Sequence, residues 1–317
     1  MKKIISLLII LSLSAANAFS AVSNEFDEDE FLIGFYWKKI SSLSANERPK
    51  TALVLGGGGA RGFAHIGVFR VLEEEKIPVD LVVGTSMGSI VGAFYCAGVS
   101  LDKIEDFAKA IDWNKVSNIG IPSLINMVLS EKLLSNEKME KFIYNTIGDL
   151  RFDQLKIPLV CVATDLNTGE RILLREGSVA FAARASSTLP GIFKPVEYRQ
   201  RYLVDGGLSE NIPVGVAKLF TPDIIIAVAV SADITKNNTD NVFTILMQSI
   251  YIQGRAFDEE NLRMADVIIR PQVNEISVAD IKRAGKIIEK GFLSAKGAIK
   301  NIKTAVINKT QEKYLFE

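Results

Sequence analysis

Residues 80–92 read DLVVGTSMGSIVG, and this stretch decides the fold. Its apolar first half predicts a buried strand, and its second half begins a predicted helix. The turn between them, G-T-S-M-G, holds Ser86 where the strand passes directly into the helix. Gly84 and Gly88 occupy the two positions where side chains would collide. The stretch therefore predicts a serine nucleophile in an α/β fold, with a glycine-rich packing turn as the alternative.

Short apolar runs alternate with amphipathic stretches on both sides of this segment, which is typical of an α/β fold. The expected strands are Thr51 to Leu55, Asp80 to Val83, Pro158 to Thr164, Arg171 to Leu174, Tyr202 to Val204, Ile224 to Ser231 and Val267 to Arg270. The expected helices are Arg61 to Glu75, Ser86 to Ala97, Leu101 to Ile111, Asn136 to Thr146, Val179 to Ser187, Val214 to Leu219 and Asn241 to Met264. We predict a three-layer α/β/α fold around a mostly parallel central sheet.

A second predicted connection from strand to helix, at residues 53–62, reads LVLGGGGARG. Consecutive glycines expose backbone N–H groups in one concave patch, which is a natural oxyanion site. The same letters match the dinucleotide fingerprint, so a nucleotide-binding module stays an alternative. That alternative is weaker because Asp80 opens the second strand, whereas the fingerprint places an acid at its far end. A phosphate-binding loop is disfavoured because Arg61 and Gly62 replace the required Lys and Ser or Thr.

Residues 202–207, YLVDGG, predict a strand that ends in an acid and two glycines, although D-G is a common turn dipeptide. This acid is a candidate base because the sequence offers no suitable histidine. A Ser-His-Asp hydrolase on an open α/β sheet needs a histidine after both the serine and the acid, but the single histidine, His65, precedes Ser86. The expected role of His65 is packing or hydrogen bonding in its own helix, and a position near the glycine loop is left open. The candidates for a base are then Asp165, Asp205 and any nearby lysine.

These blocks, taken in order, closely resemble the patatin-like phospholipase family from roughly Lys50 to Val214. The glycine loop is similar to the family's oxyanion segment, 84–88 to its nucleophile elbow, and 205–207 to its aspartate block. A further stretch at 185–193, ASSTLPGIF, resembles a block that packs beside the site in the family.

The resemblance implies a patatin-like fold in which Ser86 attacks and Asp205 accepts its proton. It implies Gly57 and Gly58 as the leading oxyanion donors, with Gly59 beside them. The remaining motif residues that it implies are Arg61, Gly62, Gly84, Gly88, Gly206 and Gly207. Two departures are visible, since Gly56 stands where some relatives have Asp, and Gly207 where many have Ala.

A direct Ser-Asp dyad needs the carboxylate about 2.6–3.2 Å from the serine oxygen, and burial would strengthen an otherwise weak base. The resemblance implies a lipid acyl hydrolase of the phospholipase A or lysophospholipase type, whose lipid substrate lies at a membrane surface. Alternatives are a small-ester or thioester hydrolase without lipid preference and a catalytically silent membrane-surface protein. Neither the oligomeric state nor a secretion partner follows from the sequence.

Composition narrows the function classes. Of 317 residues, 48% are hydrophobic, and the formal net charge is zero, which argues against a nucleic-acid partner. One histidine and two separated cysteines provide no cluster of metal ligands, and no cofactor is expected. Cys96 and Cys161 lie in apolar runs, so we expect buried free thiols, with a disulfide left open.

Residues 1–18 have the three parts of a secretory signal peptide, which predicts export to the periplasm, the medium or the outer-membrane surface. A retained anchor is the weaker alternative because the apolar run is short. Residues 19–49 form an N-terminal extension, whose aromatic run at 31–37 is expected to cover the domain or else to touch a membrane.

The catalytic domain is expected over residues 50–214. Residues 215–317 should contribute the remaining strands and basic amphipathic helices that pack on that domain. Binding of anionic lipid by the last helix is the alternative. Breaks in that helix at Gly285, Gly291 or Gly297 are left open.

Overall fold

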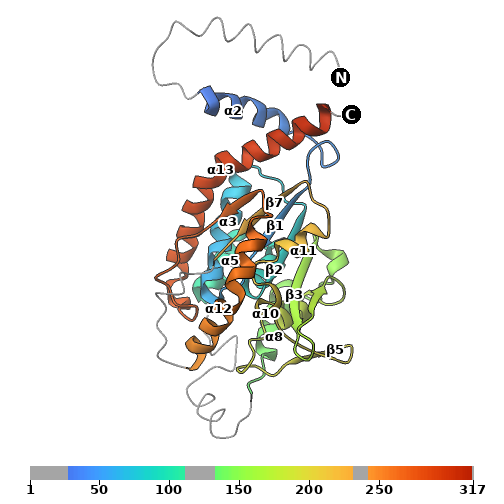
Figure 1. Ribbon diagram of the computed structural model, residues 1–317, viewed down its shortest axis with the longest axis vertical. Helices are drawn as coiled ribbons and strands as arrows, with labels where there is room; N and C mark the ends of the chain where they lie inside the picture. Colours follow the sequence, from blue (N-terminus) through green and yellow to red (C-terminus); the bar gives the residue numbers. More distant parts are fainter. Residues whose placement is uncertain (1–27, 111–132, 231–241, 316–317) are drawn as a thin grey trace, which may run out of the picture.

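The computed structural model describes residues 28–110, 133–230 and 242–315 (Figure 1). Its centre is an eight-stranded sheet in the order β5-β6-β3-β2-β1-β7-β8, with β4 also paired to β3. Strands β3, β2, β1, β7 and β8 are parallel, whereas β4, β5 and β6 pair antiparallel. The strands are β1 (Thr51–Leu55), β2 (Leu81–Thr85), β3 (Leu159–Asp165), β4 (Arg171–Leu174), β5 (Val196–Tyr198), β6 (Arg201–Asp205), β7 (Ile224–Val228) and β8 (Val267–Ile269). The predicted mostly parallel sheet is confirmed, and the short edge strand β5 was not predicted.

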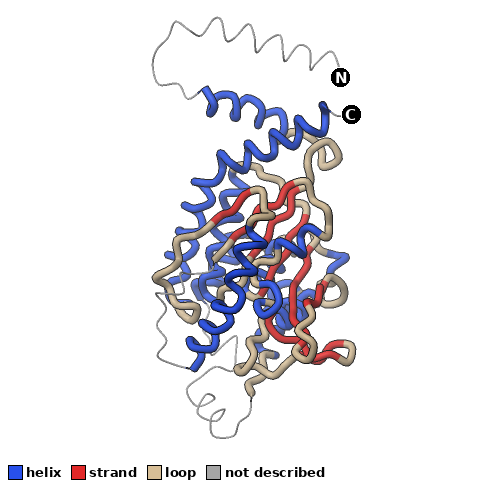
Figure 2. The backbone as a smooth tube through the Cα atoms, viewed as in Figure 1, coloured by secondary structure: helices blue, strands red, loops and turns tan. Residues whose placement is uncertain are grey.

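Helices cover both faces of the sheet, so the predicted three layers are present (Figures 1 and 2). The larger layer contains α3 (Ala64–Glu74), α4 (Met87–Cys96), α5 (Leu101–Ala110), α8 (Glu137–Ile147), α9 (Val179–Ser186) and α13 (Ala284–Leu315). The smaller layer contains α10 (Gly207–Glu210), α11 (Val214–Lys218) and α12 (Val242–Leu262). Alternate residues of β1 enter the two cores, Leu53 the larger and Val54 the smaller. This alternation explains why the central strands are apolar throughout.

The C-terminal helix α13 lies along α3 on the larger layer. The two helices approach closely at Gly67 and Gly291, where an added Cβ would overlap the backbone of the opposite helix. The helix runs unbroken through Gly285, Gly291 and Gly297. Of these glycines, Gly291 packs against α3, whereas Gly297 faces open space. Lys303 pairs with Glu75 at 2.7 Å, so part of the basic face is held by the domain.

The N-terminal helix α2 (Glu28–Ile40) attaches to the body through one face only. The Trp37 side chain is buried and donates a hydrogen bond from Nε1 to the Glu75 carbonyl at 3.1 Å. Phe31 and Phe35 lie on the other face and are 55% and 46% exposed. The expected signal peptide lies outside the described residues.

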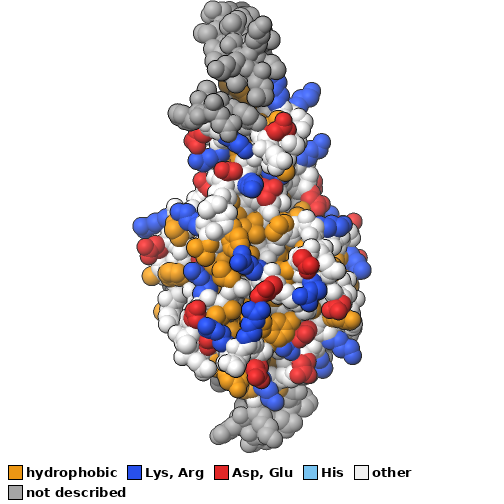
Figure 3. Space-filling view, turned by 90° about the vertical axis from the view of Figure 1, so that its right-hand side faces the viewer, with side chains coloured by type: hydrophobic (Ala, Val, Ile, Leu, Met, Phe, Trp, Pro, Cys, Tyr) orange, Lys and Arg blue, Asp and Glu red, His pale blue; other side chains and the backbone are white. Residues whose placement is uncertain are grey.

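Residues beyond the predicted catalytic domain complete the same sheet, because β7 pairs with β1 from Thr51 to Leu55. No helix in the described part of the chain is both long and apolar enough to span a bilayer. Cys96 and Cys161 are buried free thiols, as predicted. On the face seen in Figure 3, acidic and basic side chains are interspersed with hydrophobic ones. That face therefore has no extended surface of one charge.

Candidate active site

Strand β3 brings two distant parts of the sequence to one point. Its residues 161–162 pair with both β2 and β4, and its residues 163–164 pair with both β4 and β6. A strand has only two edges, so β2 and β6 must share the edge opposite β4. Strand β2 ends at Thr85 beside Val162, and β6 ends at Asp205 beside Ala163. The two strands therefore meet end to end, which places Ser86 and Asp205 together.

Ser86 has the strained backbone of a nucleophile elbow. Its φ of 54° lies in the left-handed region, and it immediately precedes α4. An added Cβ on Gly84 would meet the Gly88 backbone at 2.7 Å, so glycine is required where the strand and the helix cross. Ser86 is half-buried, so the residue is not sealed inside the core. The predicted strand-turn-helix geometry is present.

Asp205 is a buried carboxylate, with 5% of its surface exposed. Its Oδ1 accepts a hydrogen bond from the Gly207 N–H at 2.8 Å. Burial raises the pKa of Asp205 to about 6, while the Ser86 side chain and the Gly207 N–H act to lower it. Ser86 is thus close enough to influence the carboxylate. Among the described residues, no donor hydrogen-bonds the buried Oδ2, so this oxygen is available to accept a proton.

Asp165, the other acid at a strand end, has a different environment. It accepts hydrogen bonds from the Asn167 N–H at 2.9 Å and from Arg201 at 2.8 Å. These contacts lower its pKa, the Asn167 bond first and the Arg201 guanidinium with it. A carboxylate held in this way is a poorer base than Asp205. The structure thus separates two acids that the sequence left equivalent.

The glycine loop lies beside the elbow, because an added Cβ on Gly57 would come within 3.2 Å of the Ser86 Cβ. The Gly57 N–H donates to the Asn211 carbonyl at 3.0 Å. This amide is therefore committed to a partner other than a substrate. In the described part of the chain, the Gly58 and Gly59 amides donate to no backbone carbonyl.

The segment at 276–278 supports the glycine loop, and the sequence contained no local signal for this contact. Ala60 N–H donates to the Val278 carbonyl at 2.8 Å. The buried Arg61 side chain donates from Nε to the Ile276 carbonyl at 2.6 Å. Arg61 therefore anchors the loop internally.

His65 is buried in α3, and its Nε2 lies 2.8 Å from the Gly56 carbonyl oxygen. Burial lowers the pKa of His65 to about 4, so the ring is neutral near pH 7. A carbonyl only accepts, so Nε2 carries the proton. The histidine therefore positions the strand end that leads into the glycine loop, which is the alternative that the sequence left open.

The stretch at 185–193 packs directly behind the elbow. Ser186 Oγ accepts the Ser86 N–H at 3.0 Å and lies 2.8 Å from Ser89 Oγ. The Thr188 carbonyl accepts the Asp205 N–H at 2.8 Å. This block therefore contacts both halves of the candidate dyad. The sequence located the block, but the role of Ser186 required the tertiary contact.

A buried polar network lies under the glycine loop on the side of α12. The Asn211 side chain donates to Asp258 at 3.4 Å, and the Ile212 N–H donates to the same carboxylate at 3.3 Å. Burial raises the pKa of Asp258 to about 6. Next to it, the buried Glu210 pairs with Arg171. Asn211 is thus held on one side and accepts the Gly57 N–H on the other. Sequence reasoning missed this residue.

The fold and site geometry define the class, an α/β protein with a serine at a nucleophile elbow and a buried aspartate beside it. The family model described as patatin-like phospholipase matches residues 53–218, which is more than half of the chain. The protein belongs to the patatin-like phospholipase family.

Several known proteins are similar to this chain over part of its length. An uncharacterized NTE family protein of Mycobacterium tuberculosis is 35% identical over 189 residues, 60% of this chain and 51% of that protein. Mouse patatin-like phospholipase domain-containing protein 6 is 33% identical over 184 residues, 57% of this chain and 13% of that protein. The chain spans about half the length of the mycobacterial relative. Human GIVD cytosolic phospholipase A2, in complex with an inhibitor, has a TM-score of 0.48 at 11% identity, covering 90% of this chain and 65% of that chain.

Proposed function

We propose that this protein is a lipid acyl hydrolase of the phospholipase A or lysophospholipase type, with Ser86 as nucleophile and Asp205 as base. One observation carries the proposal. The register on β3 brings a serine with a φ of 54° next to a buried carboxylate. Family membership supports the choice of a lipid ester as substrate.

In the acylation step, Ser86 Oγ attacks the ester carbonyl carbon and Asp205 accepts the hydroxyl proton. When the tetrahedral intermediate collapses, the bond from carbon to the alcohol oxygen breaks, and Asp205 returns the proton to the leaving oxygen. Water then attacks the acyl-serine, and Asp205 accepts a proton from it. The free fatty acid leaves as Ser86 Oγ regains its proton, so the enzyme is restored.

The pKa of about 6 suits both halves of this cycle. A carboxylate with an ordinary pKa near 3.8 binds a proton weakly, whereas the buried Asp205 binds it more strongly. At neutral pH the carboxylate is still mostly ionised, so it is available to accept the proton. Burial thus strengthens the base without removing it from its active form.

The negative charge of the tetrahedral intermediate falls to the Gly58 and Gly59 amides in this proposal. They belong to the loop next to Ser86, and no backbone carbonyl among the described residues accepts them. One such donor typically lowers the activation barrier of acyl transfer by about 2.7–4 kcal/mol. Gly57 acts instead through its bond to Asn211, which holds the loop in place.

Covalent labelling tests the nucleophile. A fluorophosphonate probe should modify Ser86 in the wild-type protein, and Ser86→Ala should lose both labelling and turnover. Ser100→Ala is the matched control, because Ser100 is exposed at the start of α5. Circular dichroism should show that both variants keep the fold.

The substrate class needs a second measurement. Product analysis on a mixed phospholipid panel should detect free fatty acid and lysophospholipid, with no such products from Ser86→Ala. Turnover of short esters alone would favour a small-ester or thioester hydrolase. Absence of labelling would overturn the proposal and favour a nucleotide-binding module or a catalytically silent surface protein.

A further inference from the structure

A small apolar cavity lies beside the nucleophile and has no role in the chemistry above. It is bounded by α3, α4, α5, α8 and the short 3₁₀ helix η1 (Gly59–Phe63) that ends the glycine loop. Every side chain that lines it is apolar. A polar head group would lose its hydrogen bonds there at a high cost, so the chemistry of the wall selects a hydrocarbon.

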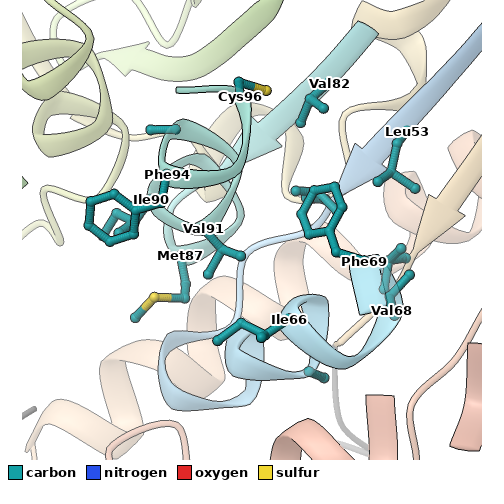
Figure 4. Packing of buried hydrophobic residues seen from close by; sticks show 14 of the residues in the cluster. Leu53, Ile66, Val68, Phe69, Val82, Met87, Ile90, Val91, Phe94 and Cys96 are labelled. Atoms are coloured by element: carbon teal, nitrogen blue, oxygen red, sulfur yellow. The ribbon is translucent and has the colours of Figure 1, made fainter. Parts of the chain in front are cut away.

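The cavity begins one residue after Ser86. Met87, Ile90, Val91 and Phe94 line it, and their spacing of three and four residues places them on one face of α4. Figure 4 shows Met87, Ile90 and Phe94 along one side of the helix, with Ile66 of α3 near Met87. Side chains on a helix lean toward its N-terminus, so Met87 lies at the level of the elbow.

Met87 also connects the cavity with the glycine loop. An added Cβ on Gly62 would meet the Met87 Cγ at 2.5 Å. Phe63, the next residue after this glycine, lines the cavity. One end of the apolar wall therefore lies between the nucleophile and the loop that we assign to the oxyanion. An acyl group on Ser86 has its carbonyl at this same junction.

We propose that this cavity is the closed form of the acyl-chain site, which receives the fatty-acyl chain of the ester formed on Ser86. The inference rests on the proposed function and adds the location of the chain and the residues that limit its length. The head group stays outside the cavity, because the apolar lining provides it with no hydrogen-bond partner.

The cavity opens by movement of its side chains. Its volume of about 20 Å³ is close to the space for one water molecule, so a chain enters only when the wall shifts. The outer end consists of Phe94, Phe107 and Phe142, whose rings contact one another with centroids 5.7 to 6.2 Å apart. Phe107 and Phe142 are half-buried, so their rings can turn outward. Met87 and Met139 have flexible side chains that adapt to an occupant.

The length of the wall sets an expected chain length. From Met87 to Phe94 the helix advances about 10 Å, at 1.5 Å per residue. An extended chain advances about 1.2 Å per bond, by analogy with an extended backbone. The wall therefore accommodates about eight bonds counted from the ester bond to Ser86, as in an octanoyl group, before the chain reaches the three phenylalanine rings.

Three variants and a series of monomeric p-nitrophenyl esters test this site. Ala108→Phe adds a ring inside the cavity, because Ala108 lines it from α5. Ala110→Phe is the matched control, since Ala110 is exposed on the same helix. Phe107→Ala removes a ring from the outer end. In the wild-type protein, kcat/KM should rise about fourfold for each added methylene up to octanoate and then level off.

Ala108→Phe should lower the ratio of octanoate to butyrate kcat/KM about 15-fold relative to wild type, the effect of two unburied methylenes. Phe107→Ala should move the plateau from octanoate toward dodecanoate, and Ala110→Phe should follow the wild-type profile. An Ala108→Phe profile equal to that of Ala110→Phe would overturn the acyl-chain site. If Ala108→Phe does not fold, an unmoved plateau in Phe107→Ala overturns it. Loss of the proposed function is distinguishable, because the wild-type protein would then hydrolyse no ester and Ser86 would not label.

Discussion

Replacing Asp205 with Asn tests the proposed base through two opposite effects, on activity and on stability. Asn keeps the size of the side chain and an oxygen that can accept the Gly207 N–H, now 2.8 Å from Oδ1. It cannot accept the Ser86 proton. Loss of a general base typically lowers turnover by about 10²–10⁴-fold, and we expect a loss in this range for Asp205→Asn.

The same substitution should stabilise the fold at neutral pH. The pKa of Asp205 rises from the ordinary value of 3.8 to about 6 in the folded protein, mainly because of burial. The native state therefore binds the proton more tightly than the unfolded state. This favourable contribution is complete below pH 3.8 and is lost as the pH rises through about 6. The difference between a pKa of 3.8 and a pKa of about 6 corresponds to about 3 kcal/mol.

The side-chain amide of the Asp205→Asn variant does not titrate, so the variant avoids this loss. Its free energy of unfolding, relative to wild type, should rise by about 3 kcal/mol between about pH 4 and pH 7. Urea unfolding of both proteins across this range measures the difference. Other buried acids, such as Glu210 and Asp258, titrate in both proteins and cancel.

Asp258→Asn is the matched control, because burial also raises the pKa of Asp258 to about 6. It should show a similar dependence of stability on pH but keep turnover. Its kcat/KM should still rise with pH through about 6, as in the wild-type protein, because Asp205 is intact. The reasoning fails if Asp205→Asn retains turnover within about tenfold of wild type. It also fails if Asp258→Asn removes the rise in kcat/KM.

Two further predictions concern positions that shape the site and its support. His65→Ala should keep the rise in kcat/KM near pH 6, because the ring is neutral in that range. It should lower the free energy of unfolding by about 1–3 kcal/mol, because the Gly56 carbonyl loses its hydrogen-bond donor. Loss of the pH-dependent rise in kcat/KM would implicate the imidazole. Gly291→Ala should destabilise the fold by about 1–3 kcal/mol, because its Cβ would overlap the Ala64 backbone. Gly297 has open space around it on the same helix, so Gly297→Ala should stabilise the fold by about 0.5–1 kcal/mol. Equal midpoints of thermal unfolding for these two variants would contradict the close contact between the helices.

Much of the fold could be predicted because its signals are local. The apolar run at 224–230 predicts a central strand, and β7 (Ile224–Val228) lies buried next to β1. The short strand β5 (Val196–Tyr198) lacked such a run, since an edge strand of three residues needs no apolar pattern. The aromatic run at 31–37 suggested a cover for the domain, but only one face of α2 makes this contact. Sequence alone does not specify which face meets a partner.

The candidate site also combines features that the sequence predicts with features that only the tertiary structure shows. The elbow at Ser86 could be predicted because its strand, turn and helix are contiguous in the sequence. Gly84 is required there by the backbone of Gly88, only four residues away. The hydrogen bond from the Gly57 N–H to the Asn211 carbonyl could not be predicted, because the two residues are far apart in sequence and meet only after the sheet forms. The same reason hid the support of the glycine loop by Val278.

The sequence by itself determined the α/β pattern, the strained serine and the absence of a histidine where a triad would need one. It left Asp165 and Asp205 as equal candidates until a family resemblance favoured Asp205. Only the tertiary structure distinguished their environments, by pairing Asp165 with Arg201 and burying Asp205 at the meeting point of β2 and β6. Backbone strain is encoded by neighbouring residues, whereas burial and strand register depend on residues brought together from the whole chain.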